Sequence, residues 1–307
     1  MSLTELENAT AERREAMHIA SGSDEQRKVL SLAAQYSVCL PTTGSSLFRL
    51  NQLLSVTPVD LRAVSDIAHS DPSIAAHVLR LVQSEHSGIG ERFRPLDECV
   101  VLLGVSIMRS LVFTTALAPT DEYTTARLKA LWQHSHLTAV LSRRIAVECG
   151  YPEVELAYVS GLLHDIGKVP LILASPQTQC ARVPAEGVLR HHPVVGARLS
   201  KMWELPSLIS DVIEHHHNPA GARHDQLLTS ITAAANQICE LHGVGLGFAP
   251  ADTYIANLAE ILSRFLPDPF GHMQEIEKRL RYDLSRWFAA LRTSEANCSR
   301  QRVQHMD

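Results

Sequence analysis

The stretch Gly161-Leu-Leu-His-Asp-Ile-Gly-Lys168 decides how the rest of this chain is interpreted. It places an imidazole and a carboxylate side by side, at His164 and Asp165, after an apolar run that opens at Tyr151-Pro152. Apolar residues recur in that run at helical spacing, and proline suits the first turn of a helix. We therefore predict a helix that Gly167 ends. Its last turn can hold a cation where it faces a polar cavity.

Histidines elsewhere in the chain give this pair a context. On its own, a His-Asp pair at a helix end is more often a surface feature than a metal site. Here His134 precedes it within an expected helix, while His192 and the pair His216-His217 follow it. Any one of them could be a helix-end imidazole beside carbonyl dipoles. As a set they favour one shared site, to which the neighbours His191 and His215 could contribute through a one-residue slip.

The order of these motifs resembles the HDOD domain, a branch of the HD superfamily of metal-dependent phosphohydrolases found in bacterial signalling proteins. The resemblance covers roughly residues 35–240 and rests on these segments: Asp71-Pro72, Leu79-Arg80-Leu81, Leu103-Gly104, Trp132-x-His134-Ser135, Gly161-Leu-Leu-His-Asp-Ile-Gly167, His192-Pro-x-Val-Gly196-Ala197, Trp203-x-Leu205-Pro206 and Ile213-x-x-His216-His217-x-Pro219. It implies an all-α fold with an HD-domain-like multi-helix architecture and an N-terminal helical subdomain.

The resemblance also implies a metal site. HD enzymes bind metal through a first His, the His-Asp pair and a later Asp, and further downstream histidines resemble those that hold a second metal. The matching residues of this chain are His134, His164, Asp165, His192, His216 and His217. Imidazole with carboxylate suits one or two divalent ions of iron, manganese, zinc or nickel. In an enzyme, Asp165 and Lys168 would serve catalysis, with Lys168 steadying the developing charge.

Two departures from the family pattern bear on catalysis. Asn236 stands where catalytic members have their last Asp, and a neutral amide is a weaker ligand that cannot act as a base. Asp225 could substitute, although it falls early. The Gly-Tyr-Pro motif of the related HD-GYP phosphodiesterases has no match after Asn218-Pro219-Ala-Gly221. Hydrolysis of cyclic dinucleotides is therefore not supported.

Composition narrows the class of protein. The chain has 307 residues, of which 45% are hydrophobic, as expected for a globular core. A net charge of −5 argues against a general nucleic-acid-binding surface. The six cysteines are dispersed without a CxxC pair, so neither a thiolate zinc site nor a disulfide framework is indicated. No signal-peptide core is evident, and no apolar run approaches the roughly 20 residues of a membrane span. We expect a cytoplasmic protein that does not contact membranes.

Helical periodicity and breaker residues divide the chain into four parts: a flexible or frayed segment 1–24, an N-terminal helical part 25–120, an HD-like part 121–240 with the His/Asp cluster, and a C-terminal helical extension 241–307. Within them we predict helices at 26–38, 46–55, from 57, from 72, 96–103, 105–118, 123–148, 193–204, 206–216, 226–241, 251–265 and 273–291. Gly104 is expected to join two of them, and Gly150 to cap another.

Two functions stay open at this point. The first is an HDOD-type signal-transduction module that acts by binding a signalling protein partner, and Asn236 favours it. The alternative is a metal-dependent phosphohydrolase acting on a phosphoester or nucleotide, which the otherwise complete ligand set favours. The oligomeric state has no signature in the sequence.

Overall fold

A computed structural model describes residues 40–42, 44–85, 93–114, 122–174, 190–241 and 244. Throughout these residues the regular elements are helices, and none of them is a β-strand. The prediction of an all-α fold is confirmed. The helices predicted at 26–38, 251–265 and 273–291 lie outside the described residues, as do the predicted segment 1–24 and nearly all of the predicted extension 241–307.

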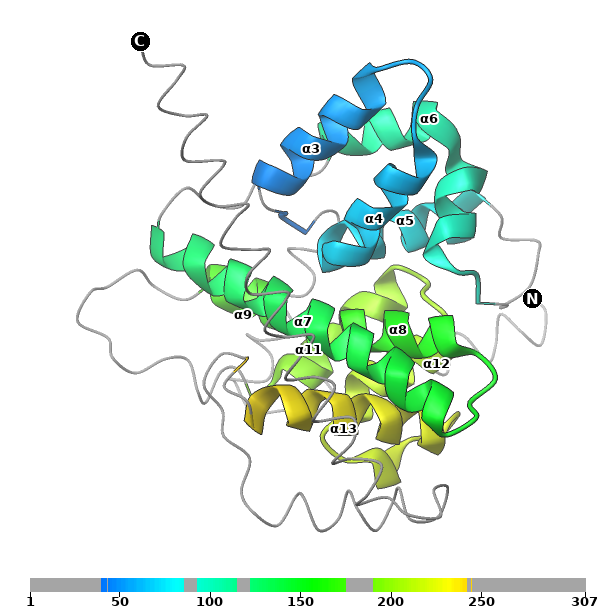
Figure 1. Ribbon diagram of the computed structural model, residues 1–307. Coiled ribbons are helices and arrows are strands. Elements are labelled where there is room, and N and C mark those ends of the chain that lie inside the picture. The colour runs from blue at the N-terminus through cyan, green and yellow to red at the C-terminus, as the bar shows by residue number, and fades with distance from the viewer. Residues whose placement is uncertain are drawn as a thin grey trace, which may run out of the picture.

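Among the described residues, four helices form the N-terminal unit at the top of Figure 1: α3 (Gly44–Ser55), α4 (Leu61–Ser70), α5 (Pro72–Glu85) and α6 (Leu96–Thr114). The Asp71 carboxylate accepts hydrogen bonds from the backbone N–H groups of Ser73 and Ile74, at 3.0 and 3.2 Å. These N–H groups have no carbonyl partner within the helix, so Asp71 acts as the N-cap of α5. In α6, Gly104 has φ 67° and kinks the helix, which confirms the predicted joint.

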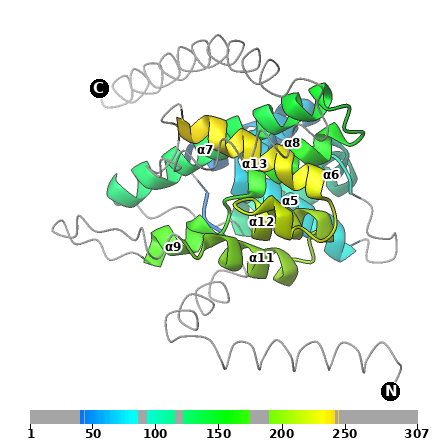
Figure 2. The same ribbon diagram turned by 90° about the horizontal axis from the view of Figure 1, so that it is seen from below.

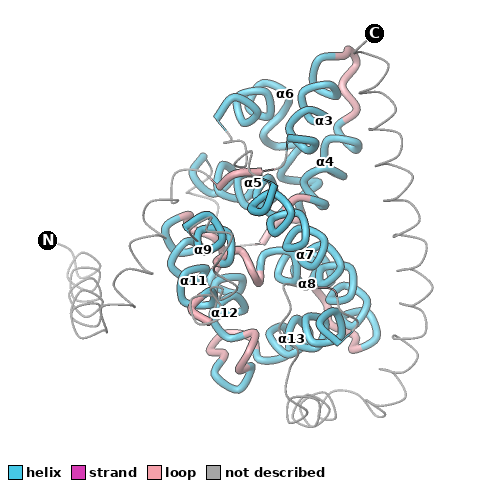
Figure 3. Tube along the Cα trace, turned by 90° about the vertical axis from the view of Figure 1, so that its left-hand side faces the viewer, coloured by secondary structure: helices cyan, strands magenta, loops and turns pink. Residues whose placement is uncertain are grey.

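The remaining elements form the HD-like unit: α7 (Glu122–Glu148), α8 (Val154–Leu163), α9 (Lys168–Ala174), α11 (His192–Met202), α12 (Ser207–His215), the 3-10 turn η1 (Pro219–Gly221) and α13 (Gln226–Leu241). Figure 3 shows them as two layers, with α7, α8 and α13 in one and α9, α11 and α12 in the other. Figure 2 shows the same α9, α11 and α12 side by side.

Small residues allow α8 to lie close to α7. A Cβ added to Gly161 would stand 2.6 Å from Ser142 Oγ and 2.8 Å from the carbonyl oxygen of Thr138. Only glycine fits at that separation. The end of α7 is capped by Gly150, whose φ of 65° is the left-handed conformation expected of a helix C-cap. The chain can therefore reverse at once and lay α8 against α7.

The helix α8 ends at Leu163, four residues earlier than predicted. His164 to Gly167 form a turn instead. Gly167 does not have a positive φ; its role is close packing, because an added Cβ would lie 2.0 Å from the carbonyl oxygen of His192 and 2.5 Å from the nitrogen of Gly196. The prediction that Gly167 terminates the helix is wrong. This glycine instead brings the His164-Asp165 turn against the start of α11.

The stretch Val154–Leu173 corrects a second expectation. It spans 20 residues with a mean hydropathy of 1.3, enough by length and composition alone to cross a membrane. The statement that no apolar run approaches that length is therefore wrong. However, 94% of its apolar 18-residue segment is buried inside the protein, and a turn separates α8 from α9 within the stretch. Both features are those of a core segment.

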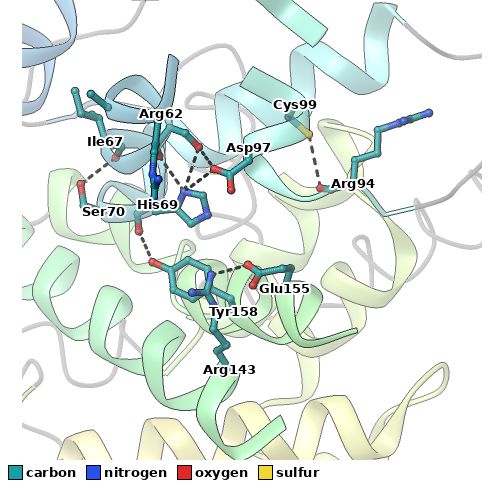
Figure 4. A network of polar contacts seen from close by, with 12 residues as sticks. Arg62, Ile67, His69, Ser70, Arg94, Asp97, Cys99, Arg143, Glu155 and Tyr158 are labelled. Carbon is teal, nitrogen blue, oxygen red and sulfur yellow. Dashed lines mark hydrogen bonds and ion pairs between the residues drawn. The ribbon is translucent and has the colours of Figure 1, made fainter. Parts of the chain in front are cut away.

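A polar network joins the N-terminal unit to α7 and α8 (Figure 4). The hydroxyl of Tyr158 on α8 donates a hydrogen bond of 2.7 Å to the carbonyl oxygen of His69 at the end of α4. The guanidinium of Arg143 on α7 lies 4.3 Å from the centroid of the Tyr158 ring, and it pairs with Glu155 at 2.5 Å. The hydrogen bond of Tyr158 and the contacts of Arg143 both hold α8, the helix that leads into the His-Asp turn.

Candidate metal centre

All six predicted ligands come together in two adjacent groups. The first consists of His134 from α7 with His164 and Asp165 from the turn after α8. The second consists of His192 at the start of α11 with His216 and His217 at the end of α12. Within each group the ligand atoms lie within 4.8 Å of one another. Each layer of the HD-like unit thus contributes one group.

The imidazole nitrogens are closely spaced in both groups. In the first, Nε2 of His134 and Nε2 of His164 are 3.3 Å apart, and each is 3.3 Å from Asp165 Oδ2. In the second, His192 Nε2 lies 3.1 Å from His216 Nε2 and 3.2 Å from His217 Nε2. Tetrahedral zinc with bonds to nitrogen of about 2.0–2.1 Å would separate its ligand atoms by roughly 3.3–3.4 Å. The spacing therefore fits a first-row divalent cation.

Asp165 connects the two groups. Its Oδ2 atom faces the first group, while its Oδ1 atom is 3.0 Å from His192 Nε2 and 3.7 Å from His216 Nε2. The side chain is fully buried. One carboxylate is therefore placed to serve cations in both groups.

Backbone carbonyls set the tautomer of three of the rings. Each places Nδ1 beside a carbonyl oxygen: His134 beside Val244 at 2.9 Å, His164 beside Gly161 at 2.8 Å, and His216 beside Ile213 at 2.9 Å. A carbonyl oxygen only accepts hydrogen bonds, so Nδ1 carries the proton and donates it. In the neutral ring Nε2 then presents a lone pair to the cluster. Carbonyl partners of this kind orient metal-binding histidines.

The arrangement leaves acceptors facing acceptors. In the first group, two Nε2 lone pairs meet the carboxylate oxygen Oδ2. In addition, Asp165 Oδ1 and Asn236 Oδ1 are buried without a hydrogen-bond partner. Burying such atoms unsatisfied costs free energy, whereas a cation satisfies them together. The donor set therefore fits a divalent transition metal.

Lys168 supplies a positive charge inside the cluster. Its ammonium group donates to Asp165 Oδ2 at 2.5 Å, and its side chain is almost fully buried. Burial alone would raise the pKa of Asp165, but His164, Lys168 and His192 oppose it and hold that pKa well below its ordinary value. Asp165 is thus an anion near neutral pH.

Two rings of the second group, His216 and His217, stay uncharged near neutral pH. Burial lowers the pKa of His217 to about 3, with His192 adding to the effect. Burial also places the pKa of His216 well below its ordinary value, helped by the neighbouring His217. Neutral imidazole is the form that binds metal, so protons compete weakly for these rings.

Three residues considered as substitute ligands lie elsewhere. His191 is the N-cap residue of α11 and belongs to neither group. His215 turns to Asp211, with its Nε2 3.5 Å from the carboxylate. Asp225 accepts hydrogen bonds from the hydroxyl of Tyr151 and the backbone N–H of Leu228, both at 2.8 Å, and so caps α13. The structure thus places none of the three in either ligand group.

One residue near the cluster has no counterpart among the predicted ligands. Glu240 on α13 is partly buried, and burial together with the charge of Asp165 raises its pKa, while Lys168, His134 and a hydrogen bond with Asn236 lower it. Asn236 itself is 3% exposed on the same helix. The spacing of four residues between 236 and 240 on an expected helix was the available signal, since it places both side chains on one face.

Comparisons with known proteins agree with this fold. A curated relative, an uncharacterized protein of Treponema pallidum (strain Nichols), is 24% identical over 212 residues, which cover 64% of this chain and 41% of that protein. The chain thus spans about two-fifths of the length of that relative. Among solved structures, the MmoQ response regulator of Methylococcus capsulatus superposes with a TM-score of 0.60 at 19% identity, covering 78% of this chain and 98% of that one. A virulence factor of Campylobacter jejuni gives 0.51 at 17% identity, covering 77% and 90%.

These structural similarities concern the fold. The family is decided by the chain itself, because the model of the HDOD domain matches residues 40–219, more than half of the sequence. The matched segment contains every predicted ligand. The chain belongs to the HDOD domain family.

Proposed function

We propose that this chain is a regulatory module of bacterial signal transduction that binds a signalling protein partner and keeps an HD-type metal centre for structural support. One observation carries the proposal, namely the burial of the cluster. Six of its seven polar side chains are at most 5% exposed: His134, His164, Asp165, Lys168, His192 and His216. A substrate needs access to the ligands, whereas a supporting ion does not. A cytoplasmic location is part of this proposal.

In this proposal His134, His164 and Asp165 hold one divalent ion of iron, manganese, zinc or nickel. His192, His216 and His217 hold a second, with Asp165 shared between them. Each ion would hold together the helices of its own layer, and Asp165, which reaches His192 across the boundary, would link the two layers of the HD-like unit. Such binding stabilises the folded chain by mass action.

The alternative is a metal-dependent phosphohydrolase that acts on a phosphoester or nucleotide. The ion pair of Lys168 with Asp165 favours it, because Lys168 could move its charge toward a phosphoryl oxygen. A bound metal would lower the pKa of water and polarise the phosphoryl group. Asp165, held as an anion, would position both the metal and Lys168. The neutral amide of Asn236 cannot serve as the base.

Elemental analysis followed by turnover assays separates the two functions. The full chain is purified, loaded in turn with iron, manganese, zinc or nickel, and assayed on p-nitrophenyl phosphate, its diester and a set of nucleotides. We expect one or two ions per chain and no turnover. Turnover that Asp165→Ala abolishes would contradict the module and establish the hydrolase. A chain that takes up no metal would remove the metal centre from both.

A further inference from the structure

The two oxygens of the Asp165 carboxylate have different partners. Oδ2 accepts a hydrogen bond of 2.5 Å from the ammonium group of Lys168. Oδ1 is buried without a hydrogen-bond partner, and it faces the second ligand group, 3.0 Å from His192 Nε2 and 3.7 Å from His216 Nε2. The carboxylate is therefore already paired with a cation through Oδ2, the oxygen of the first group, whereas Oδ1 is available to the second group.

The fold holds Lys168 in this position. Lys168 is the first residue of α9, and its backbone N–H donates to the Asp165 carbonyl at 2.9 Å, so the two residues share one turn. The buried side chains of Val169, Leu171 and Ile172 anchor α9 in the core. The Lys168 side chain is itself only 5% exposed. Separating a buried ammonium group from its carboxylate is strongly destabilising, so the pair resists separation.

A cation in the first group would have to share Oδ2 with Lys168. Oδ2 lies 3.3 Å from Nε2 of His134 and 3.3 Å from Nε2 of His164. A divalent metal bound by these three atoms would stand about 2.0–2.2 Å from Oδ2, and hence within about 5 Å of the Lys168 nitrogen. Two positive charges at that separation repel strongly in a buried site. The metal must therefore displace Lys168 or bind against its charge.

The second group offers a cation four ligand atoms without this competition. Nε2 of His192 lies 3.1 Å from that of His216 and 3.2 Å from that of His217. Asp165 Oδ1 completes a set of three imidazoles and one carboxylate oxygen, and four is the number of ligands that zinc takes in structural sites. A cation there satisfies a buried acceptor and leaves the ion pair of Lys168 with Oδ2 in place.

We infer that Lys168 competes with metal for the first group, so that the two groups differ in affinity and fill in order. The second group binds the first ion, together with Asp165 Oδ1. The first group binds an ion only weakly as long as Lys168 is paired with Oδ2. The inference rests on the proposed function, since it assumes that the cluster binds metal. Lys168 then sets the order of binding.

The test is a Co²⁺ titration of the metal-free full chain, followed by visible absorption and equilibrium dialysis. We expect one tightly bound ion in the wild type and a second that binds at least about tenfold more weakly. Lys168→Met keeps an unbranched side chain and removes its charge, so the second ion should bind at least about tenfold more tightly than in the wild type. The matched control is Lys201→Met on α11, whose side chain is 59% exposed and lies 4.0 Å from Glu214, outside both groups. It should bind as the wild type does.

Two histidine variants identify the group that holds the tight ion. His217→Ala removes a ligand of the second group and should weaken the binding of the first ion. His134→Ala should leave that ion in place and remove only the weaker one. Melting curves establish that each variant folds. A gain in affinity in Lys168→Met cannot come from a damaged fold, and the histidine variants decide the order of filling if the Lys168 variant does not fold.

The outcomes are distinct. A wild type that binds no Co²⁺ overturns the proposed centre and this inference with it. If the wild type binds Co²⁺ but Lys168→Met does not tighten the second ion, Lys168 is not a competitor, and the inference alone is overturned. Loss of the tight ion in His134→Ala would also overturn the order of filling.

Discussion

The protein packs histidines in two regions with opposite surroundings. At the interface between the units, donors meet acceptors: His69 Nδ1 lies 2.9 Å from the Ser65 carbonyl, and the His69 carbonyl receives the Tyr158 hydroxyl and lies 3.2 Å from His136 Nδ1. In the His/Asp cluster, Nε2 atoms face one another and Asp165. The interface is complete with protein groups alone. The cluster would be complete only with a cation among its ligand atoms, so the partners of a histidine, rather than its burial, indicate whether it is a candidate ligand.

Chelation should give the largest effect, and it acts on the cluster alone. If metal is present at about 100–1,000 times its Kd, it contributes about 3–4 kcal/mol to the free energy of unfolding. We expect EDTA to lower the melting temperature of the loaded wild type. Asp165→Ala should already be destabilised, because Lys168 loses its partner, and EDTA should leave it nearly unchanged. Calorimetry with and without EDTA measures this.

If EDTA does not change the melting temperature of the wild type after verified metal loading, the cluster does not differ from the interface in needing a cation. The carboxylate would then be an ordinary ion-pair partner of Lys168, and both regions would hold histidines for structure alone.

Gly167→Ala should give the next effect, because this glycine brings the two ligand groups together. The added methyl would meet backbone atoms of His192 and Gly196, which cannot move without separating α11 from the His-Asp turn. We expect a loss of about 1–3 kcal/mol or more, with weaker metal binding. Gly150→Ala is the control: its φ is 65° with no atom within 4 Å of the added carbon, so it costs about 1 kcal/mol of strain and leaves metal binding intact. Urea unfolding measures the loss of stability, and elemental analysis measures the metal bound by each variant. Equal metal content in the two variants would show that the groups do not depend on this contact.

Much of the centre could be predicted from sequence because its ligands stand in motifs. The motifs that contain His134, His164-Asp165, His192 and His216-His217 lie in or next to helices that periodicity also predicted. Local sequence could not choose among His215, His216 and His217, since the turn after α12 decides which ring faces inward. Likewise, Gly167 looked like a helix terminator because local sequence does not distinguish a glycine needed for φ from one needed for close approach. That difference is tertiary.

Other parts of the site have no signature in the sequence at all. The Val244 carbonyl orients His134 from 110 positions away, and any residue could supply a carbonyl there. The interface network also has no signature in the sequence. The pattern treats Tyr158 as one more apolar residue of α8, and its hydroxyl donates to the His69 carbonyl only because α4 packs beside it.

Acid should separate a histidine without metal from those of the cluster. His77 is 5% exposed, and burial, helped by Arg80, lowers its pKa to about 4 against the backbone hydrogen bond of Leu40. The unfolded chain binds a proton there below about pH 6.5 while the folded chain does not, so stability present above that pH is lost as the pH falls. From pH 8 to pH 5 the loss should be about 2 kcal/mol. Urea unfolding in EDTA, compared with His77→Gln, isolates this contribution, and parallel pH profiles would contradict it.

Tyr158→Phe should give the smallest effect and tests whether the two regions are independent. The substitution removes one hydroxyl at the interface and keeps the ring beneath Arg143. Because the His69 carbonyl keeps a donor in His136 Nδ1, no buried acceptor is orphaned, and the loss should be about 1 kcal/mol. The EDTA-induced shift in melting temperature should equal that of wild type, since the cluster loses no partner. A smaller shift would mean that the interface positions α8 and, through it, the His-Asp turn, so that events at the N-terminal unit reach the metal centre.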